Sequence, residues 1–329
     1  MRNVLSNIPV TFRLCMLLIS GLCVVGAAYA QGDVYPSKPV HFIVGFPPGG
    51  GVDVIARLVA DKFTQITGRH AVVENRPGAS TGIATRAVGS AKPDGYIVLV
   101  NSNSMVANQV TNAGAGYNIE RELMPVLKAA VQSNIVVAAP DLPVATLKDV
   151  IALSRRQDLT YGSPGEGSIP HLAAESLFTA LAGTKLRHIP YSGAAPALIA
   201  VAGSQVNLAC VTAPPAIPLV TGGKLKGIVV TTAKRIAALP NVPTAIEAGF
   251  PGVSIETWVG FFLPAGTPSN VSTALSNAVL QALAMADVKE KFVALGFESA
   301  DTAGAVFQRE IAGELKLWAD VVQKANLKF

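Results

Sequence analysis

Apolar residues recur along the chain in two alternating patterns. An apolar, β-rich run at residues 40–46 precedes residues 52–67, where Ile55, Leu58, Val59, Phe63 and Ile66 recur at helical spacing. Strand patterns at 71–75 and 96–100 flank a helical pattern at 82–90, and the connections are short and rich in Gly, Pro or Asp. This alternation predicts a mainly parallel sheet with helices on both faces.

The second part of the chain repeats this plan. Two long extended runs, at 126–139 and 251–263, enclose a further set of alternating strands and helices, and amphipathic helices at about 269–283 and 303–324 finish the chain. An α/β unit inserted between two connecting strands is the arrangement of a hinged clamshell. We therefore predict an α/β fold of two Rossmann-like domains joined by two crossover strands.

The predicted lobes are discontinuous in sequence. Lobe I comprises residues 31–128 and 253–329, and lobe II comprises residues 129–252. Residues 189–223 of lobe II carry no charge, but Pro196, Pro214 and Pro215 divide them into pieces of about ten residues. Such pieces are too short to cross a bilayer, so we expect this run inside the α/β domain.

Composition narrows the class of protein. The 329 residues are 50% apolar and only 14% charged, with a formal net charge of +5. So few charged residues, with no basic block, argue against nucleic-acid binding. The composition therefore favours a globular protein, and we expect no nucleic-acid partner.

The first thirty residues have the pattern of a signal peptide. Arg2 and Arg13 are followed by an apolar run, and the segment ends Ala28-Tyr29-Ala30, which predicts cleavage after Ala30 and a periplasmic or secreted protein. An uncleaved membrane anchor and lipid attachment at Cys23 are the alternatives. Cleavage leaves Cys210 as the single cysteine, which we interpret as a buried apolar side chain rather than a nucleophile.

Small, polar or glycine-rich loops follow four predicted strands. They read PPGGGVD (47–53), NSNS (101–104), PGEGSIPH (164–171) and SGAAP (192–196). Ligands of parallel sheets bind beyond the carboxyl ends of the strands, and a helix N-terminus offers free N–H groups to an anion. The loops predict an anion site, although tight turns alone would also explain each of them.

Individual polar residues in these loops allow more than one role. Ser168 is positioned to cap the helix at 169, and Asp53 either complements the helix dipole or holds a water that reaches a ligand. His171 and Glu175 have the spacing of two metal ligands, but no further His or Cys lies near them. We expect no metal and no cofactor, and we leave His171 as either a core residue or a cleft residue.

An enzyme is the main alternative to a binding protein. Residues 78–82 read GASTG, which matches the G-x-S-x-G pattern around a nucleophilic serine, so a secreted hydrolase would use Ser80 with His171 or His188. Asn75-Arg76-Pro77 intervene before this turn, and no pattern supports the partners. We therefore expect no catalytic residue.

Several long segments make the resemblance to a known family specific. The runs YPSKPVHFIVGFPPGGGVDVIARLVADKF, VVENRPGAS, LTYGSPGEGSIPHLAAESLF, HIPYSGAAPALIAVAGSQV and FFLPAGTP occur in the family's order over the whole mature chain. The chain thus resembles the substrate-binding receptors of tripartite tricarboxylate transporters, also called the Bug family. The resemblance implies a two-lobed, type II-like periplasmic-binding-protein clamshell that closes on a carboxylate and delivers it to a membrane permease.

The resemblance also implies which residues contact the ligand. In the first lobe these are Phe46, Pro48, Gly49, Gly50, Gly51, Val52, Asp53, Ser102, Asn103 and Ser104. In the second lobe they are Ser163, Gly167, Ser168, His171, Tyr191, Gly193, Ala194, Ala195 and Thr212. The chain has Cys210-Val211-Thr212 where many relatives carry an acidic residue, and NSNS where relatives often carry Thr, Gly and His. We expect a monomer whose ligand is a mono- or dicarboxylate, aliphatic or aromatic.

Overall fold

The computed structural model describes residues 35–325, with gaps at 113, 185 and 252. The described residues from 38 onward form one compact unit, and every element described here belongs to it. The predicted signal peptide and its cleavage after Ala30 lie outside the described residues. Within them, ten strands form a single sheet.

The first half of the sheet begins with three parallel strands. Strands β1 (Val40–Val44), β2 (Ala71–Asn75) and β3 (Ile97–Ser102) lie in the order β2-β1-β3. Strand β9 (Glu256–Pro264) then pairs antiparallel with β3. The predicted strands at 40–46, 71–75 and 96–100 are therefore confirmed, and the carboxyl ends of β1 and β3 lie at one edge.

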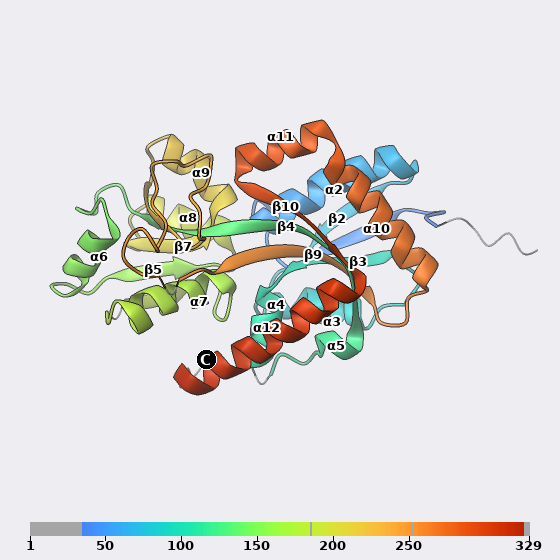
Figure 1. Ribbon diagram of the computed structural model, residues 1–329, viewed down its shortest axis with the longest axis horizontal. Helices are drawn as coiled ribbons and strands as arrows, with labels where there is room; N and C mark the ends of the chain where they lie inside the picture. The colour runs from blue at the N-terminus through green and yellow to red at the C-terminus, as the bar shows by residue number, and fades with distance from the viewer. Residues whose placement is uncertain (1–34, 113, 185, 252, 326–329) are drawn as a thin grey trace, which may run out of the picture. The chain divides into compact units, whose positions relative to one another are not determined.

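The longest strand, β4 (Leu123–Ala138), joins the two halves of the sheet. Its residues 123–133 pair with β9 and β10 (Phe297–Ala303), whereas its residues 134–138 pair with β7 (Leu208–Thr212) and β8 (Lys226–Val230). Strands β5 (Thr160–Ser163) and β6 (Arg187–Pro190) continue in parallel beyond β7. Figure 1 shows β4 and β9 side by side between the halves, as the two predicted connecting strands.

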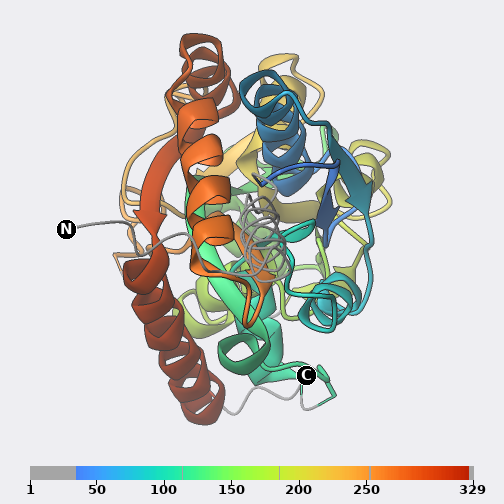
Figure 2. The ribbon, with the colours of Figure 1, turned by 90° about the vertical axis from the view of Figure 1, so that its right-hand side faces the viewer.

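Helices cover both faces of the first half. Helices α2 (Gly51–Thr67) and α10 (Ser269–Ala284) pack together on one face, as Figures 1 and 2 show. Helices α3 (Gly82–Gly89), α4 (Ser104–Thr111) and α12 (Gly304–Ala325) cover the other. The apolar stripe of α2 faces the sheet, because its Ile55, Val59 and Phe63 are fully buried.

The second half has the same layered arrangement. Helices α8 (Ala194–Ala202) and α9 (Ala213–Thr221) lie on one side of its strands, and α7 (Ile169–Glu175), extended by the π-helical turn η2 (Ser176–Leu181), lies on the other. Helix α6 (Leu147–Ser154) begins with a capping box formed by Thr146 and Asp149. The uncharged run at 189–223 folds as α8, β7 and α9 within this half, as predicted.

Each half has its own apolar cluster. In the first, Phe42 is fully buried and meets the edges of Phe63 and Phe261 at ring-centroid distances of 5.7 and 5.5 Å. In the second, Tyr161 and Phe178 pack with the buried face of β7. Separate cores on either side of β4 are what two lobes require.

Some elements of the structure are not predicted by the hydrophobic pattern. Helix α11 (Ala286–Leu295) and strand β10 lie between α10 and α12, and the short helix α5 (Ile119–Glu122) precedes β4. Strand β10 shows little alternation because much of its length is exposed. No single described helix has the length and hydropathy of a membrane span; α10 and α11 reach them only as a pair, bent by 72°.

The aromatic contact between sheet and helix gives a stability prediction. Phe42→Ala removes a ring that packs against both α2 and β9, so we expect the free energy of unfolding in urea to fall by about 3–5 kcal/mol. Val72→Ala on the neighbouring strand β2 is the matched control, because Val72 is 45% exposed. Equal effects of the two substitutions would contradict this assignment of the core.

Candidate functional site

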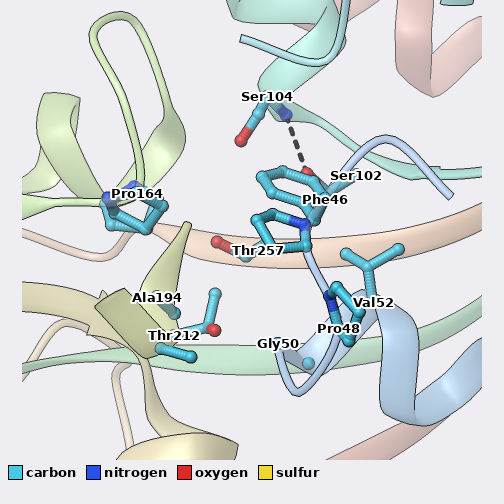
Figure 3. Close-up of a pocket in the computed structure, with 14 residues that line it drawn as sticks. Phe46, Pro48, Gly50, Val52, Ser102, Ser104, Pro164, Ala194, Thr212 and Thr257 are labelled. Atoms are coloured by element: carbon cyan, nitrogen blue, oxygen red, sulfur yellow. Dashed lines mark hydrogen bonds between the residues drawn. The ribbon is translucent and has the colours of Figure 1, made fainter. Parts of the chain in front are cut away.

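A cavity lies at the carboxyl ends of the strands, between loops of the two halves. The carboxyl ends of parallel strands are the usual place for a small-molecule ligand, and the cavity is narrow in this arrangement. The residues that line it are Phe46, Pro47, Pro48, Gly50, Gly51, Val52, Ser102, Ser104, Pro164, Pro170, Ala194, Ala195, Thr212 and Thr257. Figure 3 shows Pro48, Gly50 and Val52 opposite Pro164, Ala194 and Thr212.

The structure brings together most of the predicted first-half residues and the start of α8. The predicted residues that line the cavity are Phe46, Pro48, Gly50, Gly51, Val52, Ser102, Ser104, Ala194, Ala195 and Thr212. The predicted residues outside this lining are Gly49, Asp53, Asn103, Ser163, Gly167, Ser168, His171, Tyr191 and Gly193. Most of the second group hold the loops in place.

Asp53 fixes the loop between β1 and α2. Its carboxylate accepts hydrogen bonds from the Gly49 N–H at 3.0 Å and from Asn75 Nδ2 at 2.8 Å, and it pairs with Arg57. Burial raises the pKa of Asp53, but the hydrogen bonds from Arg57, Gly49 and Asn75 outweigh it and hold the pKa below its usual value. Asp53 therefore shapes the glycine loop, whose Gly49 has a φ of +84°.

The loop after β3 presents its two serines to the cavity and turns Asn103 away. The Ser104 N–H donates to Ser102 Oγ at 3.2 Å, the contact drawn in Figure 3. Asn103 Nδ2 donates to the carbonyl of Glu256, at the start of β9, over 3.1 Å. Asn103 thus ties this loop to the connecting strand.

The predicted polar residues around α7 support one another behind the cavity wall. Ser168 Oγ accepts a hydrogen bond from the His171 N–H at 3.4 Å, which confirms Ser168 as the helix cap. His171 Nδ1 accepts from the Gly167 N–H at 3.0 Å, and Ser163 Oγ lies 2.7 Å from His188 Nε2. These bonds set the position of the loop whose Pro164 reaches the cavity.

Contacts between loops of the two halves close the cavity. A Cβ on Gly193 would lie only 2.8 Å from Pro47 Cδ, so the absence of a side chain permits this approach. The Ile169 N–H donates to Ser104 Oγ at 3.2 Å, and Ser80 Oγ donates to the Glu166 carbonyl at 2.5 Å. The structure is therefore a closed arrangement of the two halves.

Ser80 is one of these closing contacts, and nothing in its surroundings supports the hydrolase alternative. A nucleophilic serine donates its proton to a base, whereas Ser80 donates to a backbone carbonyl. The nitrogens that His171 and His188 direct at Gly167 and Ser163 are occupied by those contacts. The GASTG turn therefore has a structural explanation.

The sequence did not single out four lining residues: Pro47, Pro164, Pro170 and Thr257. The three prolines lie inside loops that the sequence identified, so their positions were within reach. Thr257 lies in β9, and only the antiparallel pairing of β9 with β3 brings the start of β9 to the carboxyl end of β3. No local sequence signal marks such a residue.

The cavity wall carries no ionisable side chain among its fourteen lining residues. Negative charge could be balanced there by helix N-termini, because α2 and α8 both begin at the cavity. The described residues hold no group of three His, Cys, Asp or Glu side chains arranged to bind a metal ion. Glu175, which has the spacing of a second metal ligand beside His171, accepts a hydrogen bond from the Tyr161 hydroxyl at 2.5 Å.

Cys210 lies in β7 and is fully buried. Burial raises the pKa of its thiol to about 12, so the reactive thiolate is strongly disfavoured. The sequence-based interpretation of Cys210 as an apolar core residue is confirmed.

Comparisons with known proteins agree on one family. The family described as "Tripartite tricarboxylate transporter family receptor" matches residues 55–327. A "UPF0065 protein in tcbD-tcbE intergenic region" of Pseudomonas sp. (strain P51) is 32% identical over 90% of this chain and 88% of its own length.

Two solved structures are similar over 89% of this chain and 99% of their own length. The periplasmic binding protein BugD is 30% identical with a TM-score of 0.85. A Rhodopseudomonas palustris protein determined with adipate is 31% identical with a TM-score of 0.86.

The stacked side chains of His171 in α7 and His188 in β6 predict how stability depends on pH. Their ring centroids are 3.9 Å apart, and burial, with a further contribution from His171, lowers the pKa of His188 from 6.5 to about 4. The stabilisation from neutral His188 is complete above pH 6.5 and is lost as pH falls towards 4. We expect the free energy of unfolding of the wild type, relative to His188→Gln, to decrease over this range in urea titrations.

Glu314 of α12 predicts the opposite dependence of stability on pH. It lies in the same surface cleft as Asn103, and burial raises its pKa from 4.5 to about 7 despite a 2.6 Å hydrogen bond from Trp258 Nε1. The protonated Glu314 carboxyl contributes to the free energy of unfolding below pH 4.5, and this contribution is lost as pH rises through 7. The wild type should therefore lose stability relative to Glu314→Gln between pH 5 and 8, and trends of the same sign for both variants would contradict these assignments.

Proposed function

The chain belongs to the receptor family of tripartite tricarboxylate transporters, and on this premise we propose that its cavity binds a small carboxylate for delivery to a membrane permease. The protein is a solute-binding receptor with a two-lobed α/β periplasmic-binding-protein fold. The expected fold class and the expected family are thereby confirmed. The family is one of solute-binding proteins rather than enzymes.

The observation that carries the ligand proposal is an uncharged cavity with the N-termini of two helices, α2 and α8, at its wall. A carboxylate placed there loses its hydration, and backbone N–H groups at the starts of α2 and α8 replace it. Each charge-assisted hydrogen bond contributes about 1.5–3 kcal/mol. The adipate in the Rhodopseudomonas palustris relative supports a carboxylate as the class of ligand.

Closure of the halves is the proposed second step of binding. The two halves already touch each other directly. Pro47 lies against Gly193, and the Ile169 N–H donates to Ser104 Oγ. A ligand shifts the open and closed populations only by its different affinity for them. Donors on α2 and α8 meet a ligand together only in the closed form, so a carboxylate favours closure.

The remaining features of the proposal concern location and assembly. We place the mature protein in the periplasm after cleavage following Ala30, in line with the periplasmic binding proteins of its family. We propose lobe I at residues 31–128 and 253–329, lobe II at 129–252, and a monomer that docks on permease subunits. No cofactor or metal takes part in this proposal.

Filling the cavity tests the proposed function. Ala195→Trp places a large ring among the lining residues, so we expect the affinity for carboxylates to fall at least about 100-fold in isothermal titration calorimetry, which is about 2.7 kcal/mol. The thermal midpoint should change little, because Ala195 is not part of the fully buried core.

The matched control is Ile199→Trp, one turn further along α8, where the side chain is 71% exposed. This control should bind as the wild type does. If Ala195→Trp also retained wild-type affinity, the ligand would not occupy this cavity. If no mono- or dicarboxylate stabilised or bound the wild type, the proposed function itself would be contradicted.

The closing contact at Gly193 gives an independent prediction. Gly193→Val adds methyl groups where Pro47 already lies 2.8 Å from a Cβ, so the halves cannot approach as they do here. We expect small-angle X-ray scattering to report a larger radius of gyration and calorimetry to report weaker binding. Gly313→Ala is the control, because no atom lies within 4 Å of its Cβ; the same expansion in both variants would contradict the role of Gly193.

A further inference from the structure

We propose that the solute is a small monocarboxylate, with its one carboxylate between the starts of α2 and α8 and an uncharged, largely apolar remainder at the other end of the cavity. This inference rests on the proposed function and narrows its ligand class. It depends on which helix starts at the cavity have free N–H groups, and on what lies opposite them.

The start of α2 and the start of α8 provide the carboxylate end. The N–H groups of Gly51 and Val52, and those of Ala194 and Ala195, make no hydrogen bond to the described residues. The contact of Pro47 with Gly193 brings these two starts together. The dipoles of both helices therefore act on one place.

An unpartnered hydroxyl points to a ligand at this end. Thr212 ends β7, is only 8% exposed, and lines the cavity. Its side chain does not cap α9, and it makes no hydrogen bond within the described chain. Figure 3 shows Thr212 beside Ala194, across the cavity from Gly50. The Thr212 oxygen stays accessible from the cavity, so its hydroxyl is free to donate to a ligand oxygen there.

Two further helices that begin on the cavity wall, α7 and α9, offer few free donors. In α7 the Ile169 N–H is used by Ser104 Oγ, residue 170 is proline, and the His171 N–H is used by Ser168 Oγ. In α9 the second and third residues, Pro214 and Pro215, have no N–H group. These two helices cannot replace the hydration of a second carboxylate.

The side chains near the start of α7 complete the argument. Phe46, Pro164 and Pro170 are apolar, and the lining includes no Lys, Arg or His. Ser102 and Ser104 each already accept a backbone N–H, so each hydroxyl has one proton left to donate and supplies no positive charge. A second carboxylate would be buried there without a counter-charge, and its desolvation would oppose binding.

The test compares acids that differ in a single terminal group. Calorimetric titrations of the wild type would use butanoate with succinate, pentanoate with glutarate, hexanoate with adipate, and benzoate with terephthalate. We expect the best monocarboxylate to bind at least about tenfold more tightly than the dicarboxylate of its pair. Tighter binding of the dicarboxylate in the pair that binds best would overturn the inference and leave the proposed function intact. Absence of binding in all four pairs would contradict both.

A variant tests the place of the carboxylate. Thr212→Val removes the hydroxyl and keeps the shape, so the best monocarboxylate should bind about tenfold more weakly, the effect of one charge-assisted hydrogen bond. Thr221→Val, at the exposed end of α9, is the matched control and should bind as the wild type does. Unchanged affinity in Thr212→Val would overturn the assignment of the carboxylate to this end.

Discussion

Asn134 lies where the connecting strands pass from one half of the sheet to the other, and its hydrogen bonds define that junction. Its Nδ2 donates to Thr231 Oγ1 at 3.2 Å and to the Ile255 carbonyl at 3.0 Å, and its Oδ1 accepts from Thr257 Oγ1 at 2.7 Å. Asn134 is fully buried, and these three side-chain bonds join segments distant in sequence. A buried, satisfied amide fixes a register that apolar packing alone would leave free.

The cavity depends on this junction. Strand β4 changes partners between residues 133 and 134, so Asn134 stands at the first residue that pairs with β7, opposite Thr212. Thr257, held by Asn134, lines the cavity between the two halves. The same residue therefore positions a lining hydroxyl and the point about which the halves would move, which links the shape of the site to the geometry of closure.

Much of the fold could be predicted from local sequence patterns. The elements and residues that could not be predicted depend on solvent exposure or on pairing between distant strands. Alternating strands and helices, with glycine loops after the strands, predicted the sheet and most of the cavity lining, because the carboxyl ends of parallel strands meet at one edge. Strand β10 escaped prediction because it lies at an edge, where exposure removes the alternation. Thr257 escaped because its position depends on pairing between strands more than 150 residues apart in sequence.

The polar residues of the second half show a different limit. Ser163, Ser168 and His171 are predicted to contact a ligand, and this stays a prediction. In this structure they lie outside the cavity lining and form hydrogen bonds that hold their loops. A loop that must present a rigid wall needs its own N–H and hydroxyl groups satisfied, so small polar residues recur there whether or not a ligand touches them. Residue type at a strand end thus indicates where a site lies, whereas the role of each side chain there depends on the hydrogen bonds of the folded loop.

The turn at residues 78–81 shows how the closed arrangement is supported from outside the cavity. Ala79, Ser80 and Thr81 have φ values of +47°, +46° and +76°, a conformation that costs about 1–3 kcal/mol for each non-glycine residue. Asn108 Nδ2 contacts the Ala79 carbonyl at 3.4 Å, and Ser80 reaches the Glu166 carbonyl of the other half. Asn108 thus holds the strained turn within its own half, and Ser80 joins it to the loop that carries Pro164 and Gly167. The turn therefore supports the contact between the halves from a conformation that its own half maintains.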